Sequence, residues 1–174
     1  MRTIKTLILI FVPVIFIVSC GKIEQLPDTP YIEYRSFAIF DTIDNPDLGN
    51  ECKGGKLKFY FEDGDGDLGL ESPEEATGDT VNLFLSLYRK VDGVMVEVSD
   101  DDLLKPSGYR IPYIERTGRN KILKGTIEVT FLYLFYSTAD TDTVRYDFYI
   151  KDRAGNISNE ESTNEIALSE NAVY

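Results

Sequence analysis

The chain of 174 residues contains no histidine and no tryptophan. Without histidine it can form neither Ser-His nor Cys-His catalytic arrangements, nor a histidine-ligated metal site. The lack of tryptophan counts modestly against a carbohydrate-binding module with flat aromatic platforms. A phosphate loop is also missing, because the glycine-rich stretch DGDGDLG is acidic where phosphate binding needs exposed N–H groups. These absences predict that the protein is not an enzyme.

The first twenty residues, MRTIKTLILIFVPVIFIVSC, begin with a positive charge at Arg2 and continue as an apolar run over 7–18. A membrane-spanning helix needs about 20 apolar residues, so this run is too short to span but suits a signal peptide. Its last four residues, IVSC, resemble the lipobox of bacterial lipoproteins. The resemblance implies cleavage after Ser19 and lipid attachment to Cys20, because several acyl chains give durable membrane anchoring.

We therefore predict a signal peptide over 1–19, which is removed, and a lipidated, polar, proline-bearing tether over 20–30. By analogy with other lipoproteins, the lack of aspartate directly after Cys20 suggests the outer membrane, on its periplasmic or its external face. With Cys20 lipidated, Cys52 has no partner, and no internal disulfide can form.

Cleavage leaves 16 basic against 30 acidic residues, a net charge of −14. A chain this acidic is repelled by nucleic acid and by anionic lipid headgroups, so its predicted membrane contact is the lipid on Cys20. With 30 acidic residues, two carboxylates lie close together by chance, so such a pair does not support a glycosidase.

Residues 31–174 alternate repeatedly between apolar and polar positions, the pattern of half-buried strands. The alternating segments are YIEYRSFAIF, KLKFYFE, VNLFLSLYRK, VMVEV, GTIEVTFLYLFYS, TVRYDFYIKD and NEIAL. VDG at 91–93 predicts a hairpin turn, RAGN at 153–156 predicts another turn, and Pro112 points to an edge strand or a bulge. About seven or eight strands suit a two-sheet antiparallel sandwich formed by one domain.

Two segments carry a family resemblance. YDFYIKDRAGNISNE is similar to the closing hairpin of bacterial immunoglobulin-like and fibronectin type III-like domains. Together with GGKLKFYFEDGDGDLG, it resembles an uncharacterised group of lipoproteins from the Bacteroidota. The resemblance implies an immunoglobulin-like β-sandwich over 31–174 and says almost nothing about activity.

The stretch EDGDGDLGLESPEE places carboxylates at alternate positions directly after a predicted strand. Counted as a calcium loop, it offers oxygens from Asp63, Asp65, Asp67, Gly69, Glu71 and Glu74. Leu68 stands where an EF-hand needs glycine, and a strand leads into the loop, so an EF-hand is excluded. Two interpretations stay open: a looser Ca²⁺ site with hard oxygen ligands, or a solvated Asp-Gly turn. A second acidic cluster, SDDD at 99–102, is interpreted as a solvated loop or a helix cap.

Several aromatic side chains fall on the outward face of the predicted strands: Phe84, Tyr88, Tyr136 and Tyr149. They either form a binding surface or are covered by a neighbouring element. We predict a non-catalytic cell-envelope lipoprotein that acts in adhesion or as an accessory binding module, with an envelope protein or a glycan as its partner. The alternative is a glycan-binding accessory lipoprotein of a polysaccharide-uptake system.

Overall fold

A computed structural model describes residues 25–45, 47, 49–71, 80–102, 104–106, 108–115, 120–134 and 143–174. The predicted signal peptide, Cys20, Glu74 and Tyr136 lie outside these ranges. Within the described ranges the chain forms strands, bridges and turns, and no helix. No helix in this part of the chain has the length and apolarity that crossing a membrane requires.

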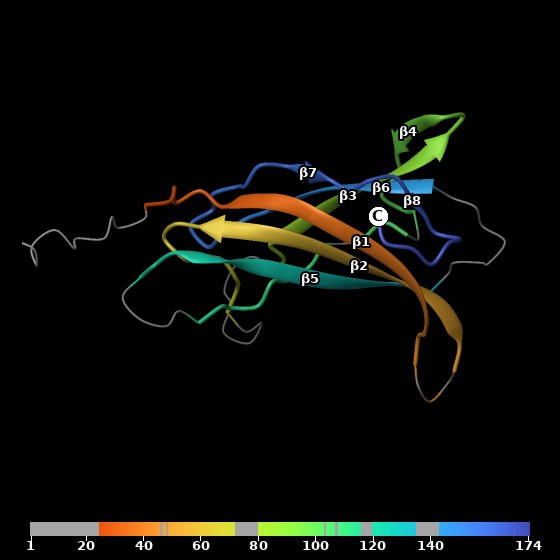
Figure 1. The fold of residues 1–174 in the computed structure, drawn as a ribbon, viewed down its shortest axis with the longest axis horizontal. Helices are drawn as coiled ribbons and strands as arrows, with labels where there is room; N and C mark the ends of the chain where they lie inside the picture. Colours follow the sequence, from red (N-terminus) through yellow and green to blue (C-terminus); the bar gives the residue numbers. More distant parts are fainter. Residues whose placement is uncertain are drawn as a thin grey trace, which may run out of the picture.

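The described residues form eight strands in two antiparallel sheets (Figure 1). The strands are β1 (Tyr31–Ile43), β2 (Glu51–Asp63), β3 (Leu83–Val91), β4 (Val94–Glu97), β5 (Leu123–Tyr133), β6 (Thr143–Ile150), β7 (Glu161–Ser162) and β8 (Ile166–Ala167). One sheet has the order β1-β2-β5, and the other has the order β4-β3-β6-β7 with β8 also paired to β6. The prediction of an all-β, antiparallel chain is confirmed.

The core lies between the two sheets and is built from the inward positions of the alternating segments. Phe59 of β2 packs on Phe148 of β6 with ring centroids 5.4 Å apart, and Phe37 of β1 stacks on Tyr146 of β6 at 5.6 Å. All four side chains are buried. Because each pair joins one sheet to the other, the two sheets share a single hydrophobic core, an arrangement consistent with a β-sandwich.

The turn between β3 and β4 follows the prediction from VDG. Asp92 and Gly93 both have positive φ, at 49° and 82°, and Val91 pairs directly with Val94. A two-residue loop with positive φ at both positions matches the twist of the strands that it joins. The segment around Pro112 forms no strand: it makes isolated bridges, Leu83 to Tyr109 and Leu70 to Pro112.

The C-terminal residues run along the outer edge of β1. Phe37 and Tyr174 exchange two backbone hydrogen bonds, of 3.1 and 2.8 Å, and Ile39 N–H donates to the Ala172 carbonyl. At the other end of β1, where the strand begins, β2 reaches its last residue (left in Figure 1). The loop after β2 and the turn after β6 meet there, and this corner holds the acidic site.

Candidate cation site

Three aspartates from two different sheets converge at this corner. Asp63 is the last residue of β2, Asp67 lies in the loop that follows, and Asp152 comes directly after β6. One carboxylate oxygen from each of the three lies within 4.8 Å of the others. The loop and the closing turn thus bring together charges that are 85 or more positions apart in the sequence.

Asp63 is the most deeply buried of the three, with no exposed surface. Its Oδ2 accepts a hydrogen bond from the Leu68 N–H at 2.7 Å. Its Oδ1 is shielded from solvent and has no hydrogen-bond partner among the described residues. A buried carboxylate oxygen without a partner is costly, because burial removes its water without replacing it.

Asp67 and Asp152 are held by the turn that closes the domain. Asp67 Oδ2 accepts from the Ala154 N–H at 3.0 Å, while its buried Oδ1, like that of Asp63, meets no donor in the described part of the chain. Asp152 is 2 % exposed and accepts from both the backbone N–H and the side-chain amide of Asn156, at 2.7 and 2.8 Å. Hydrogen bonds therefore fix each carboxylate in place, and Asp63 and Asp67 each keep one buried oxygen without a donor in the described part of the chain.

The electrostatics of the corner disfavour three negative charges in the protein alone. Burial raises the pKa of Asp63 to about 6, and the charges of Asp65 and Asp67 act in the same direction, against the Leu68 N–H. Burial also raises the pKa of Asp67, with the Asp152 charge as the next cause. Both carboxyl groups would return toward their ordinary pKa if a cation lay between them.

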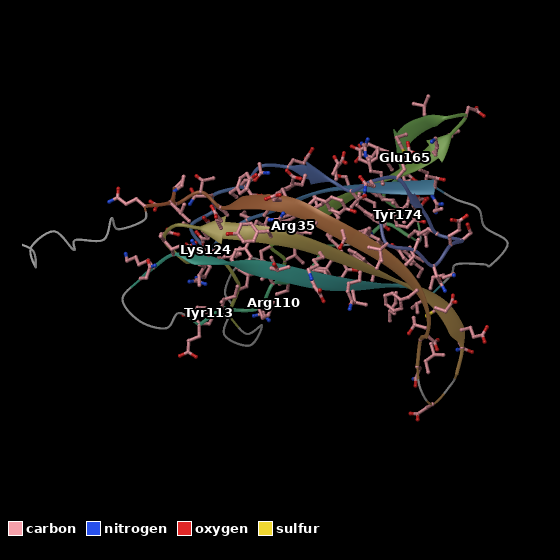
Figure 2. All side chains as sticks on the ribbon, in the orientation of Figure 1. Arg35, Arg110, Tyr113, Lys124, Glu165 and Tyr174 are labelled. Atoms are coloured by element: carbon pink, nitrogen blue, oxygen red, sulfur yellow. The ribbon has the colours of Figure 1, made fainter. Side chains whose placement is uncertain are left out.

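The charge of Arg153, next to Asp152 in the sequence, opposes the burial that raises the pKa of Asp67, but Arg153 forms no ion pair with the cluster among the described residues. Arg153 donates from Nη1 to the Gly69 carbonyl at 2.7 Å, and its guanidinium lies 5.0 Å from the ring centre of Tyr113, which Figure 2 labels. In the described part of the chain, no lysine or arginine forms an ion pair with Asp63, Asp67 or Asp152. The Arg153 guanidinium thus donates its hydrogen bonds to carbonyl oxygens at this corner.

Glycines shape the loop at two positions. Gly66 and Gly69 have φ of 68° and 95°, in the region that favours glycine. A Cβ on Gly69 would also lie 2.4 Å from the Pro112 carbonyl oxygen. The positive φ of Gly66 lets the loop turn between Asp63 and Asp67.

The predicted ligand set is brought together only in part. Asp63 and Asp67 converge, and Asp65 is half-buried between them and raises the pKa of both. The Gly69 carbonyl accepts the Arg153 guanidinium, Glu71 is exposed, and Glu74 lies outside the described residues. Sequence reasoning missed Asp152, because the adjacent RAGN segment indicates only a turn.

The predicted aromatic surface is a second candidate site, on the outer face of β3 and β6. Phe84 and Tyr149 are direct cross-strand partners whose rings stack 5.0 Å apart. They line a hollow of about 410 Å³, whose other lining residues include Ser86, Asp100 and Lys105. Tyr88 is covered by the Arg145 guanidinium at 4.7 Å.

Comparison of the chain with protein-family models, with curated proteins and with solved structures finds no match in any of the three.

Proposed function

We propose that the protein is a non-catalytic binding module of the cell envelope, anchored through a lipid on Cys20 and stabilised by Ca²⁺ at the Asp63–Asp67–Asp152 corner. One observation carries the calcium part: aspartates at or just after strands of both sheets converge, and the buried Oδ1 atoms of Asp63 and Asp67 meet no donor among the described residues. Buried charges in proteins are paired or coordinate metals, and no lysine or arginine that the structure describes forms an ion pair with these carboxylates.

The donor chemistry favours Ca²⁺. Carboxylate oxygens are hard ligands, and Ca²⁺ binds such oxygens at about 2.3–2.6 Å, so two ligands on one ion lie at most about 5 Å apart. The limit of 4.8 Å on the three oxygens falls inside that range. Mg²⁺ needs shorter bonds, near 2.0–2.1 Å, in a strict octahedron, which suits a loop of fixed backbone less well. Water completes the shell.

The ion acts as a structural link. Asp63 belongs to the sheet of β1, β2 and β5, and Asp152 follows β6 of the other sheet. A cation bound to both joins the sheets at one corner and relieves the repulsion between the carboxylates. Its contribution is therefore to the stability of the scaffold, and the scaffold presents the binding surface.

Thermal unfolding of the mature chain tests the calcium proposal. At a Ca²⁺ concentration one hundred times the Kd, a site present only in the folded state adds about 2.7 kcal/mol. For a domain of this size that amount raises the Tm by about 5–10 °C relative to a chelator. Asp67→Asn keeps an acceptor for the Ala154 N–H and should lose the rise, whereas the exposed Asp47→Asn should keep it. An unchanged midpoint at 10 mM Ca²⁺, which is about ten times the weakest Kd of extracellular sites, would refute the proposal.

The anchor and the immunoglobulin-like identity rest on sequence features. The IVSC motif supports the anchor, and the eight antiparallel strands with the DRAGN turn support the likeness to immunoglobulin-like domains. Cys20→Ser should leave the precursor unprocessed and move the protein out of the detergent-extracted membrane fraction. A correctly processed, membrane-bound Cys20→Ser variant would contradict the anchor.

A specific observation favours glycan binding as the second candidate function. The hollow beside Phe84 and Tyr149 combines stacked aromatic rings with a hydroxyl and charged groups, the mixture that binding pockets for small polar ligands use. Loss of glycan-array binding in Tyr149→Ala, with retention in the exposed Tyr31→Ala, would support it. Co-purification with an envelope protein and no glycan signal would favour adhesion or accessory binding instead.

A further inference from the structure

The segment that leads from the anchor into the domain lies directly against the acidic loop. Gly64 N–H donates to the Pro27 carbonyl at 3.0 Å. A Cβ at position 64 would lie 2.3 Å from the Leu26 carbonyl oxygen and 2.4 Å from that of Pro27. Backbone therefore packs on backbone here, at a distance that only glycine permits.

Gly64 is also part of the cation corner. It follows Asp63 directly, and the short loop that it begins is closed by the Leu68 N–H on Asp63 and fastened at Asp67 to Ala154. The same four-residue loop thus faces the carboxylate cluster on one side and residues 26–27 on the other. Any opening that separates the carboxylates moves Gly64 as well.

Residues 25–29 have few other attachments. In the described part of the chain, the bond from Gly64 is the only hydrogen bond that they make. Pro30 is buried, and regular pairing begins one residue later, at Tyr31 with Glu62. The docking of this segment therefore depends mainly on the position of the loop.

We propose that cation binding at Asp63, Asp67 and Asp152 docks residues 26–30 onto the domain, so that Ca²⁺ sets the residue at which the tether from Cys20 ends. This inference rests on the proposed calcium site. When the ion is bound, the carboxylates are drawn together and Gly64 is held where it meets Pro27. Without the ion, repulsion between the carboxylates favours an open loop, and the segment is released up to Tyr31.

The release changes how far the domain reaches from the membrane. Freeing the five residues 26–30 adds up to about 18 Å to the extended tether, at about 3.3–3.6 Å per residue. With the anchor at Cys20, calcium holds the domain closer to the membrane and restricts its orientation. Calcium thereby regulates the presentation of the binding surface as well as its stability.

Hydrogen exchange of the mature full chain, measured by mass spectrometry with Ca²⁺ and with a chelator, tests the docking. The amide at position 64 should exchange at least about tenfold more slowly with Ca²⁺, because it is then held by Pro27. If Ca²⁺ raises the Tm but leaves this exchange unchanged, the docking is overturned and the calcium site stands. If Ca²⁺ neither raises the Tm nor slows exchange, both proposals fail.

Two substitutions at the docking contact, one in the loop and one in the tether, extend the test without changing a carboxylate ligand. Coupling between sites is reciprocal, so weakened docking must weaken Ca²⁺ binding. Gly64→Ala, which blocks the contact, and Pro27→Gly, which loosens the segment outside the loop, should each lower the Ca²⁺ affinity by about threefold or more. The distant Asp47→Asn should leave it unchanged. An unchanged Ca²⁺ affinity in both Gly64→Ala and Pro27→Gly would overturn the inference.

Discussion

Two shielded carboxylates in this domain, Asp102 and Asp63 of the acidic corner, are held in opposite ways. Asp102 makes a two-pronged ion pair with Arg89, at 2.9 and 3.2 Å, which lowers the pKa of the Asp102 carboxyl. Asp63 receives one backbone N–H and otherwise faces other carboxylates, and burial raises its pKa to about 6. Both carboxylates are shielded from solvent, and of the two only Asp102 forms an ion pair with a basic side chain among the described residues.

The difference shows what the acidic corner lacks. A guanidinium fork matches the geometry of a carboxylate, and the fold uses it at Asp102. At the corner the neighbouring Arg153 points its guanidinium at the Gly69 carbonyl instead. Backbone amides position the three aspartates but carry no full charge. Under the calcium proposal, a cation from solution would neutralise the corner as the Arg89 guanidinium neutralises Asp102.

The largest effect should follow Asp152→Asn. Without Ca²⁺ this change removes an acceptor from the Asn156 side-chain amide, at a cost of about 1 kcal/mol. With saturating Ca²⁺ the ion's contribution of about 2–3 kcal/mol is lost in addition. Urea unfolding in both conditions should show the cost growing with Ca²⁺. An equal cost in the two conditions would mean that Asp152 does not bind the ion.

The pH dependence of the calcium-free protein should distinguish the two kinds of carboxylate. Because the folded pKa of Asp63 is raised, its contribution to stability is fully present below its unfolded pKa, near 3.9, and is lost as pH rises through about 6. The loss approaches about 3 kcal/mol at neutral pH. Asp102 has the opposite sign: its contribution is present above the unfolded pKa and is lost as pH falls through the lowered folded value.

Urea unfolding from about pH 3 to 7 measures both signs against matched variants, because the Asp102 change falls below the unfolded pKa of about 3.9. The difference in stability between the parent and Asp63→Asn should decrease from about pH 4 upward in calcium-free buffer. The difference between the parent and Asp102→Asn should increase from lower pH and then stay level. Parallel curves for the parent and Asp63→Asn would show that the corner is not under electrostatic stress.

Asp102→Asn should destabilise the protein by about 1–3 kcal/mol at neutral pH, because Arg89 then lies partly buried without its charged partner. Ca²⁺ should not change this cost, since the ion pair forms no part of the acidic corner. Denaturant unfolding with and without Ca²⁺ checks the independence. If the free-energy cost of Asp102→Asn changes with Ca²⁺, the two sites are coupled.

The smallest effect concerns the aromatic face. A double-mutant cycle between Phe84→Ala and Tyr149→Ala should give a coupling of about 0.5–1 kcal/mol, the usual value for an aromatic pair. The coupling should be the same with Ca²⁺ and with a chelator. No coupling would mean that the two rings move independently, and a rigid aromatic surface would then have no support.

Alternation along the chain predicted much of the fold, because each strand carries its own signal. Phe59 and Phe148, placed inward by a period of two, are buried against each other. The two-residue turn at Asp92 and Gly93 also carries a local signal. The segment around Pro112 shows the limit: the proline suggested an edge strand or a bulge, and the segment forms only isolated bridges.

Sequence reasoning identified only part of the candidate site. The spacing of Asp63 and Asp67 is visible in one loop, but Asp152 lies 85 positions further along the chain. The position of Asp152 beside Asp63 and Asp67 depends on how the two sheets pack, and no local sequence pattern indicates that packing. Asp102, interpreted as part of a solvated loop or helix cap, is paired with Arg89 of β3, 13 positions earlier, a contact that the SDDD run does not indicate.

A crystal structure of the mature domain grown or soaked in about 50 mM Ca²⁺, well above the Kd of about 10⁻⁴–10⁻³ M typical of extracellular sites, tests the central claim most directly. The account predicts one ion at the corner, bonded to carboxylate oxygens of Asp63, Asp67 and Asp152 at about 2.3–2.6 Å. No ion at the corner under these conditions, or an ion held by Glu71 without Asp152, would contradict it.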